Sequence, residues 1–396
     1  MVDPNASEWL KKQQRASRKT RLIVSTVGIL VIIAVVAGVV YALMHKGTSG
    51  GGNSGSRGNS DGFSGGNSGV GGGKGANLPS NPDGPYYTND GKPVNLTITP
   101  DPRLHKSFYG INYGPILALF PWCTNTLGDT IEDLKVLSQL TNRLRLYGMD
   151  CNMLNFTVQA IDLLKLDMTV VPTVWVDGNE TTYTRQYNDL FNNLDQHGIS
   201  RIEGVSVGNE AIFRKQVTID NLNSRIADVR NKIKAKYPNA NTPVFTSDIG
   251  SNVDKAFVAG SDVIFANVHP YFGGVSVNIG ATWTFDFFQN FDVKPAAEAG
   301  KPAVISEIGW PTNGTSERDA VASVDNLQTF LDTYVCTANT KQTKYYYFEA
   351  FDTPWKKAYF TVLEGSWGLF NPDRSFKPGI KLPDCQVTAG GITSTT

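Results

Sequence analysis

The stretch IEGVSVGNEAIFRKQVTIDNLNSRIADVRNKIKAKYPNANTPVFTSDIG (202–250) decides the fold. It begins and ends with short apolar runs, 202–210 and 243–250, and the residues between them, 219–237, carry a helical pattern. A strand, a helix and a second strand in this order are typical of two parallel strands joined by a crossover. The stretch therefore predicts a parallel sheet.

The same alternation extends from Arg103 to Cys385 and contains eight apolar runs. Eight such units predict an α/β fold of the (β/α)8 TIM-barrel type, which typically needs about 250 residues. A doubly wound open sheet is the competing fold, but residues 115–122 after the first run contain no G-x-G-x-x-G phosphate loop. The predicted strands lie in 107–114, 142–148, 168–176, 202–210, 243–250, 262–271, 302–310 and 345–352, and helical patterns cover 130–140, 155–166, 184–198, 219–237 and 320–335.

A stretch of 23 uncharged residues, 22–44, precedes the predicted barrel. As a helix it would be about 34 Å long, enough to cross a hydrocarbon core of about 30 Å. A buried core helix would show a polar face, but this stretch offers only Ser25 and Thr26. A cleaved signal peptide would have a shorter apolar region of about 7–15 residues. We therefore expect an uncleaved transmembrane signal anchor.

Charge is distributed unequally around this predicted anchor. The chain holds 36 Lys+Arg and 36 Asp+Glu, but residues 1–21 hold six bases and two acids. The positive-inside rule then places residues 1–21 in the cytosol and the rest outside, as a single-pass type II protein of the cell membrane. Residues 103–385 hold 26 bases and 30 acids, which argues against nucleic acid as a partner.

Residues 47–77 are built from Gly, Ser and Asn and predict a flexible tether. The expected organisation is therefore a basic tail (1–21), the anchor (22–44), a disordered linker leading into the fold (47–102), the barrel (103–385) and a C-terminal tail (386–396). All four cysteines and four N-glycosylation sequons follow the anchor. Cysteines in an oxidising compartment suggest up to two disulfides, with three possible pairings. The residues concerned are Cys123, Cys151, Cys336 and Cys385, and the sequon asparagines Asn95, Asn155, Asn179 and Asn313.

Two carboxylates end otherwise apolar runs on the fourth and seventh predicted strands: Glu210 in GVSVGNEA and Glu307 in PAVISEIGW. In a barrel, catalytic side chains lie at the carboxyl ends of the strands. A buried Glu is costly unless it is paired, hydrogen-bonded or used chemically. A satisfied ion pair is the structural alternative. Other strand-end residues are Tyr113, Arg145, Trp175, Asn209, Asp248, His269, Tyr271, Trp310, Glu349 and Asp352.

Two carboxyl groups in unequal environments are suited to cleaving a glycosidic bond, since one can give a proton while the other stays ionised. Asn209 is placed to bind a sugar hydroxyl, and the charge of Arg145 would favour an ionised Glu307. Trp175 and Trp310 offer flat faces for sugar rings, unless they are ordinary core residues. Four His and no H-E-x-x-H motif make a metal site unexpected, and no G-x-S-x-G elbow is present. No cofactor is expected.

The sequence resembles glycoside hydrolase family 17, and most closely the fungal membrane-anchored glucan endo-1,3-beta-glucosidases. The motifs FYGINYGP (108–115), GVSVGNEAIFR (204–214) and VISEIGWPTNG (304–314) carry this resemblance. It implies a TIM barrel that hydrolyses β-1,3-glucan with retention, with Glu210 as the acid/base and Glu307 as the nucleophile. It also implies substrate-site positions, which are Tyr113, Arg145, Asn209, Tyr271, Trp310 and Glu349.

The resemblance suggests a role in remodelling cell-wall glucan from the plasma membrane. A β-1,3-glucanosyltransferase would use the same glycosyl-enzyme and differ only in the acceptor. An inert glucan-binding wall tether is a further alternative, although the presence of both Glu210 and Glu307 argues against it. β-1,3-Glucan and the membrane are the expected partners, and no obligatory protein partner is evident from the sequence.

Overall fold

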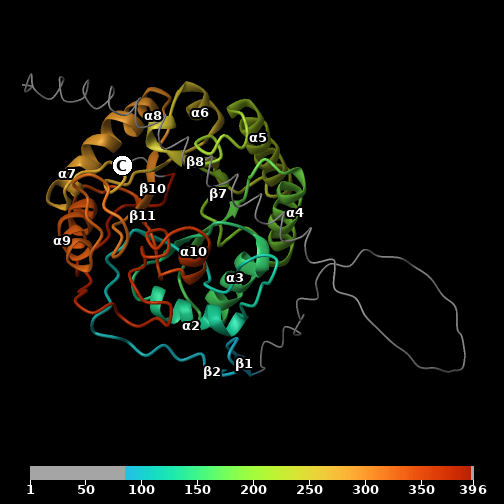
Figure 1. The fold of residues 1–396 in the computed structure, drawn as a ribbon. Helices are drawn as coiled ribbons and strands as arrows, with labels where there is room; N and C mark the ends of the chain where they lie inside the picture. The colour runs from blue at the N-terminus through green and yellow to red at the C-terminus, as the bar shows by residue number, and fades with distance from the viewer. Residues whose placement is uncertain (1–84, 394–396) are drawn as a thin grey trace, which may run out of the picture. The chain divides into compact units, whose positions relative to one another are not determined.

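The computed structural model describes residues 85–393, which fold around a parallel β-barrel (Figure 1). Its nine strand segments follow the order β5-β4-β3-β11-β10-β9-β8-β7-β6. All neighbouring pairs are parallel. The segments are β3 (Gly110–Asn112), β4 (Arg143–Arg145), β5 (Thr169–Val171), β6 (Thr173–Val174), β7 (Val205–Asn209), β8 (Val244–Ile249), β9 (Ile264–Asn267), β10 (Ala303–Ile308) and β11 (Tyr345–Tyr347).

The two ends of this strand order, β5 and β6, are separated only by Pro172. Proline has no N–H to donate and interrupts strand pairing, whereas its carbonyl accepts from the Ser206 N–H at 2.9 Å. β5 and β6 are therefore two parts of one strand, and the barrel has eight strand positions. The barrel predicted from the alternating pattern is confirmed.

Helices connect the strands and form an outer ring in Figure 1. Side-chain caps define several of the helix starts, since Thr126, Asn179, Thr218 and Ser323 each accept a bond from the first turn. The helices are α2 (Leu127–Leu137), α3 (Met153–Leu163), α4 (Glu180–His197), α5 (Ile219–Lys236), α6 (Lys255–Gly260), α7 (Val277–Phe288), α8 (Lys294–Glu298), α9 (Val324–Thr340) and α10 (Pro354–Tyr359), with short helical turns η1 (Asp150–Asn152), η2 (Gly250–Asn252) and η3 (Gln289–Val293).

A small antiparallel hairpin, β1 (Tyr86–Tyr87) with β2 (Pro93–Val94), packs on α2 before the barrel begins. Thr126 donates to the Tyr87 carbonyl at 2.9 Å, and Gly128 lies so close to that carbonyl that a β-carbon would meet it at 2.2 Å. Residues 85–102 therefore belong to the folded unit rather than to the disordered linker predicted from composition. The hairpin is too short to identify from sequence, because its stability comes from the helix beneath it.

The C-terminal segment also packs on the barrel, at the amino ends of the strands. Ile392 is 1% exposed, and its N–H donates to Glu203 at 3.1 Å. Tyr109 donates to the Gly390 carbonyl at 2.9 Å. Within the described part of the predicted tail, residues 386–393, Ala389 and Ile392 thus pack into the core.

The cysteines pair as Cys123–Cys151 and Cys336–Cys385, which selects one of the three open pairings. The second bond joins α9 to the segment that leads into the C-terminal contact. Within residues 85–393, no helix has both the length and the apolar character needed to cross a bilayer. The predicted anchor at 22–44, the basic tail at 1–21 and most of the predicted linker lie outside the described residues.

Candidate active site

Glu210 and Glu307 lie at the carboxyl ends of β7 and β10, which are separated in the barrel by β8 and β9. Glu210 directly follows β7, and Glu307 is the penultimate residue of β10. The register pairs Glu307 with Asn267 of β9, and Asn209 with Ser247 of β8. Both carboxylates therefore reach the same end of the barrel, where TIM-barrel sites are found.

The backbone at Glu210 is left-handed, with φ of 53°. This conformation costs of order 1–3 kcal/mol for a residue with a side chain and persists only where the surroundings impose it. Here the Glu210 N–H donates to the Ser247 carbonyl at 2.8 Å. Asp248 accepts the N–H groups of Ile212 and Phe213 at 3.0 and 3.2 Å. The end of β8 thus fixes the turn that carries Glu210.

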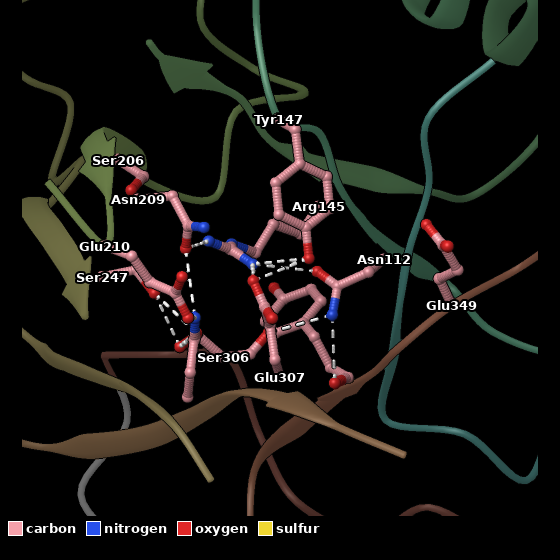
Figure 2. Close-up of polar contacts among 12 residues, drawn as sticks. Asn112, Arg145, Tyr147, Ser206, Asn209, Glu210, Ser247, Ser306, Glu307 and Glu349 are labelled. Atoms are coloured by element: carbon pink, nitrogen blue, oxygen red, sulfur yellow. Dashed lines mark hydrogen bonds and ion pairs between the residues drawn. The ribbon is translucent and has the colours of Figure 1, made fainter. Parts of the chain in front are cut away.

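Glu307 is held by three hydrogen-bond partners from two other strands or their ends, and Figure 2 shows two of them, Arg145 and Tyr147. Its Oε1 accepts from Arg145 at 3.1 Å and from Tyr147 at 2.9 Å, and its Oε2 lies 3.2 Å from His269 Nε2. Burial by itself would raise the pKa of Glu307. The hydrogen bond from His269, the charge of Arg145 and the hydrogen bond from Tyr147 outweigh burial and lower the pKa to about 2. Glu307 is therefore a carboxylate at neutral pH.

Glu210 has the opposite character. Its Oε1 accepts from Asn267 at 2.9 Å, and its Oε2 lies 3.5 Å from the Arg214 guanidinium. Burial and the negative charge of Glu307 raise the pKa of Glu210 to about 7, against the opposing effects of Asn267 and Arg214. At pH below about 7, Glu210 carries a proton while Glu307 does not.

The two carboxyl groups are connected through a shared polar network (Figure 2). Arg145, which is completely buried, donates to Asn209 Oδ1 at 2.8 Å and to Asn112 Oδ1 at 3.1 Å. Asn267 donates to Glu210 and is oriented by the hydroxyl groups of Ser247 and Ser306, which donate to its Oδ1 at 3.0 and 2.6 Å. These hydrogen bonds determine which atom of each Asn amide group accepts and which donates. The orientation of the amides is thereby fixed, and each carboxylate is held in one position.

Several predicted substrate residues lie in the wall of the barrel instead of on its surface. Tyr113, Tyr271 and Trp310 are each 0% exposed. Tyr113 donates to Asp133 at 2.7 Å, Tyr271 to the Thr315 carbonyl, and Trp310 to the Val321 carbonyl at 2.9 Å. Each of these side chains is bound to a structural partner and none presents a face to solvent, so their contact with substrate stays a prediction.

Glu349 is also buried but lies apart from the network of Glu210 and Glu307, as Figure 2 shows. It accepts from Lys356 with both oxygens at 3.0 Å and from Thr353 at 3.1 Å. Burial raises its pKa, against the charge of Lys356. Its partners make it a paired group at the edge of the site.

Aromatic side chains with open surface lie beside the two carboxylates. Trp175 is half-buried under the Arg214 guanidinium, whose carbon lies 4.7 Å from the ring centre. Phe213 and Phe272 are each 49% exposed, and Phe272 contacts the His269 ring at 5.7 Å between centroids. Flat apolar faces of this kind suit sugar rings better than the buried Trp310.

Some members of the site were not identified from the sequence: Tyr147, Asn267 and Arg214. Tyr147 follows Arg145 by two residues, and Asn267 precedes His269 by two. The spacing of two along a strand would have placed them on the same face as the residues that were identified. Glu364 was missed as well. Burial raises the pKa of Glu364, and the charges of Lys356, His269 and Glu307 act on it.

The four sequon asparagines differ in their surroundings. Asn95, Asn179 and Asn313 are exposed, whereas Asn155 is half-buried in α3. Asn155 Oδ1 accepts from Gln159 at 2.6 Å and lies 2.8 Å from His197. Glycosylation at the four sites stays a prediction, and Asn155 differs from the other three in being half-buried.

Within residues 85–393, no three His, Cys, Asp or Glu side chains are grouped to hold a metal ion. The chemistry that the arrangement itself supports is acid and nucleophile work by two carboxyl groups. Glu307 is ionised and immobilised, and Glu210 is protonated at mildly acidic pH with a pKa that allows it to lose the proton. This pair of states is suited to acid-assisted cleavage of a glycosidic bond.

Comparisons with known proteins give consistent matches. A family model described as the BtgE/BtgC glycoside hydrolase domain matches residues 110–368. A probable glucan endo-1,3-beta-glucosidase of Aspergillus terreus is 40% identical over 320 residues, which are 74% of this chain and 48% of that protein. The glucan endo-1,3-beta-glucosidase of Emericella nidulans is 36% identical over 312 residues, which are again 74% of this chain and 48% of that protein. The chain thus spans about half the length of these relatives.

Solved structures resemble the barrel. The β-1,3-glucanosyltransferase of Rhizomucor miehei, of which an active-site mutant was solved with laminaritriose, is 29% identical with a TM-score of 0.62. The match covers 70% of this chain and 98% of that one. An endo-laminarinase from Formosa is 18% identical with a TM-score of 0.57, covering 68% of this chain and 84% of that one. The latter match supports the fold alone.

Proposed function

The chain belongs to the BtgE/BtgC glycoside hydrolase family, and from that membership we propose that it cleaves β-1,3-glucan with retention of configuration. The family membership also confirms the resemblance carried by the motifs around Glu210 and Glu307. The observation that supports cleavage is the opposed protonation of two carboxyls at one end of the barrel, with a pKa of about 7 for Glu210 and about 2 for Glu307. Because inverting enzymes need the same opposition, retention is proposed from the resemblance of the two Glu motifs. An inert glucan-binding protein would have no need for this opposition.

In the proposed mechanism, Glu210 protonates the leaving glycosidic oxygen while Glu307 attacks the anomeric carbon. The bond between sugar and leaving group breaks, and a glycosyl ester of Glu307 forms. Glu210, now ionised, takes the proton of an incoming hydroxyl as its oxygen displaces Glu307. Two inversions at one carbon give net retention.

Arg145, Tyr147 and His269 hold the attacking carboxylate. Their hydrogen bonds keep Glu307 ionised in a buried site and hold both of its oxygens in place. Asn209 is fixed by Arg145 beside Glu210 and is suited to bind a hydroxyl next to the reacting carbon. Trp175, Phe213 and Phe272 would supply the flat faces on either side.

The test is the anomeric configuration of the first product released from laminarin oligosaccharides, followed by proton NMR. We expect the β-anomer first, and Glu307→Gln should lower turnover by about 10³-fold or more, since the covalent route is lost. First release of the α-anomer, or full activity of Glu307→Gln, would overturn the proposal. Phe213→Leu, which leaves both carboxyls intact, should mainly raise KM.

Transfer to a sugar acceptor is a second candidate, favoured by the similarity to the Rhizomucor miehei β-1,3-glucanosyltransferase. Both reactions share the glycosyl-enzyme and differ in whether water or a sugar hydroxyl reaches it. A product profile at increasing laminarioligosaccharide concentration separates them. Products longer than the substrate indicate transfer, and shorter products alone indicate hydrolysis.

We also propose that residues 22–44 anchor the protein as a type II membrane protein with the barrel facing the cell wall. The uncharged stretch, the basic residues before it and the Gly/Ser-rich tether after it support this arrangement. Disulfides Cys123–Cys151 and Cys336–Cys385 suit an oxidising compartment. Protease added outside intact cells should release an active barrel, and glycosidase treatment should reduce the mass of a protein glycosylated at Asn95, Asn179 or Asn313. A barrel protected from external protease would contradict this topology.

A further inference from the structure

Arg214 lies on the turn after Glu210 and is held against it from several sides. Its Nη1 is 3.5 Å from Glu210 Oε2, its Nη2 donates to the Asn209 carbonyl, and its Nε donates to Gln216 at 3.1 Å. The guanidinium stacks over Trp175, and the side chain is 29% exposed. Arg214 is therefore a positioned charge rather than a freely moving surface arginine.

Charges reach Glu210 from three directions. Glu307 on β10 and Asp248 on β8 are negative and favour its protonated form, while Arg214 on its own turn favours the ionised form. Asn267 on β9 contributes a neutral amide hydrogen bond. Arg145 on β4 reaches Glu210 only through Asn209 and Asn267, and His269 bonds to Glu307. Among these described groups, Arg214 is the positive charge in direct contact with Glu210.

This balance changes during the proposed reaction. Once Glu307 has attacked, its carboxylate is an ester and no longer carries a charge. The negative charge that favoured protonated Glu210 is gone, while the positive charge of Arg214 remains. Glu210 must then be ionised to take the proton of the acceptor hydroxyl, as that oxygen bonds to the anomeric carbon and the electron pair of the ester bond returns to Glu307.

We propose that Arg214 is a positioning residue for the second half of the reaction, where it holds Glu210 ionised and so sets the rate of transfer to the acceptor. This inference rests on the proposed function. It assigns Arg214 no part in releasing a leaving group that departs without a proton, so with such a substrate the two half-reactions should respond differently to its removal.

The test uses the full chain and 2,4-dinitrophenyl β-laminaribioside, whose leaving group departs without a proton. Release of dinitrophenol then reports attack by Glu307 as a burst, and the steady state reports the second half-reaction. A charge at this distance and exposure is worth about one pH unit. In Arg214→Gln the burst should persist. The acidic limb of the pH profile of the steady-state rate, where the rate falls as Glu210 becomes protonated, should move to higher pH by about one unit. Below that limb the steady-state rate should fall by about tenfold.

Two variants separate charge from structure. Arg214→Lys keeps the charge but loses the forked contact, so the limb should return toward the wild-type position. Arg185→Gln is the matched control, since Arg185 also stacks on an aromatic ring, Phe120, pairs with Asp150 and is 30% exposed. It should leave the limb unmoved. Azide, which needs no base, should restore turnover in Arg214→Gln.

An unmoved limb in Arg214→Gln, or a Lys variant as impaired as the Gln variant at every pH, would overturn the role of Arg214. Loss of the burst in Arg214→Gln would do the same, because the first half-reaction would then depend on this residue. A wild-type product of inverted configuration would instead overturn the proposed function itself. The two failures are therefore distinguishable.

Discussion

Removal of the Tyr147 hydroxyl should change the pH below which the enzyme loses activity. Tyr147→Phe deletes the 2.9 Å bond to Glu307 but leaves the ring, which packs edge-on against Phe348 at 6.1 Å. The ring also keeps its place beneath the Arg145 guanidinium. The change therefore removes two hydrogen bonds of one hydroxyl, the bond donated to Glu307 and the 3.1 Å bond accepted from Arg145.

The magnitude follows from the pKa of Glu307, which is about 2 instead of 4.5. That difference is about 3 kcal/mol of preference for the carboxylate, at about 1.4 kcal/mol per pH unit. Tyr147 contributes less to it than His269 or Arg145. We take its hydrogen bond as about 1.4 kcal/mol, near the lower end for bonds to a charged group. The acid limb should therefore rise by about one pH unit.

The assay is kcat/KM for laminarin between pH 2 and pH 9. In Tyr147→Phe the acid limb should move to higher pH, while the alkaline limb near pH 7, set by Glu210, stays in place. Because a lowered folded-state pKa stabilises the protein above the unfolded-state pKa, the variant should be less stable than the wild type at neutral pH, and this difference should disappear as pH falls toward the pKa of wild-type Glu307, about 2. Tyr109→Phe is the control, since Tyr109 bonds to the Gly390 carbonyl at the other end of the barrel. An unchanged acid limb, or movement of the alkaline limb instead, would refute the reasoning.

Three further changes test the site and the fold. Glu210→Gln should lower turnover of laminarin by about 10³-fold but spare attack on activated dinitrophenyl glycosides, which need no acid. Azide should then yield a glycosyl azide of retained configuration. Equal losses on both substrates would contradict the acid/base role. Ile392→Ala should cost about 2–5 kcal/mol in denaturant unfolding, because its side chain fills the amino end of the barrel, whereas a free tail would show no change. Gly128→Ala should lower Tm by displacing the hairpin carbonyl of Tyr87, and an unchanged Tm would show that the hairpin does not need this contact.

The barrel and the two carboxylates could be predicted from sequence because each rests on a local pattern. Apolar runs alternating with helical periodicity specify parallel strands, and a Glu ending such a run stands out against its neighbours. The partners of Glu307 have no such local signal. Arg145 lies 162 residues away in the chain, and the contact exists only because β3 and β11 bring β4 near β10 when the barrel closes.

The same limit explains the residues that were misplaced. Trp310 lies within the motif of Glu307, but nothing local reveals that its ring packs inward against Phe330 and bonds to Val321. Residues 386–393 are mostly polar or small, so Ile392 has no pattern around it to indicate burial. Short segments stabilised by distant surfaces are the part of this fold that single-sequence reasoning cannot reach.

The central claim is that Glu307 forms a covalent bond to the sugar. A 2-deoxy-2-fluoro-β-laminaribiosyl fluoride slows the second half-reaction and should trap that ester. Digestion and mass spectrometry of the inactivated protein should find one fluorosugar, on Glu307, and Glu307→Gln should take up none. A label on Glu210, Glu349 or Glu364, or no label at all on an active enzyme, would contradict the account.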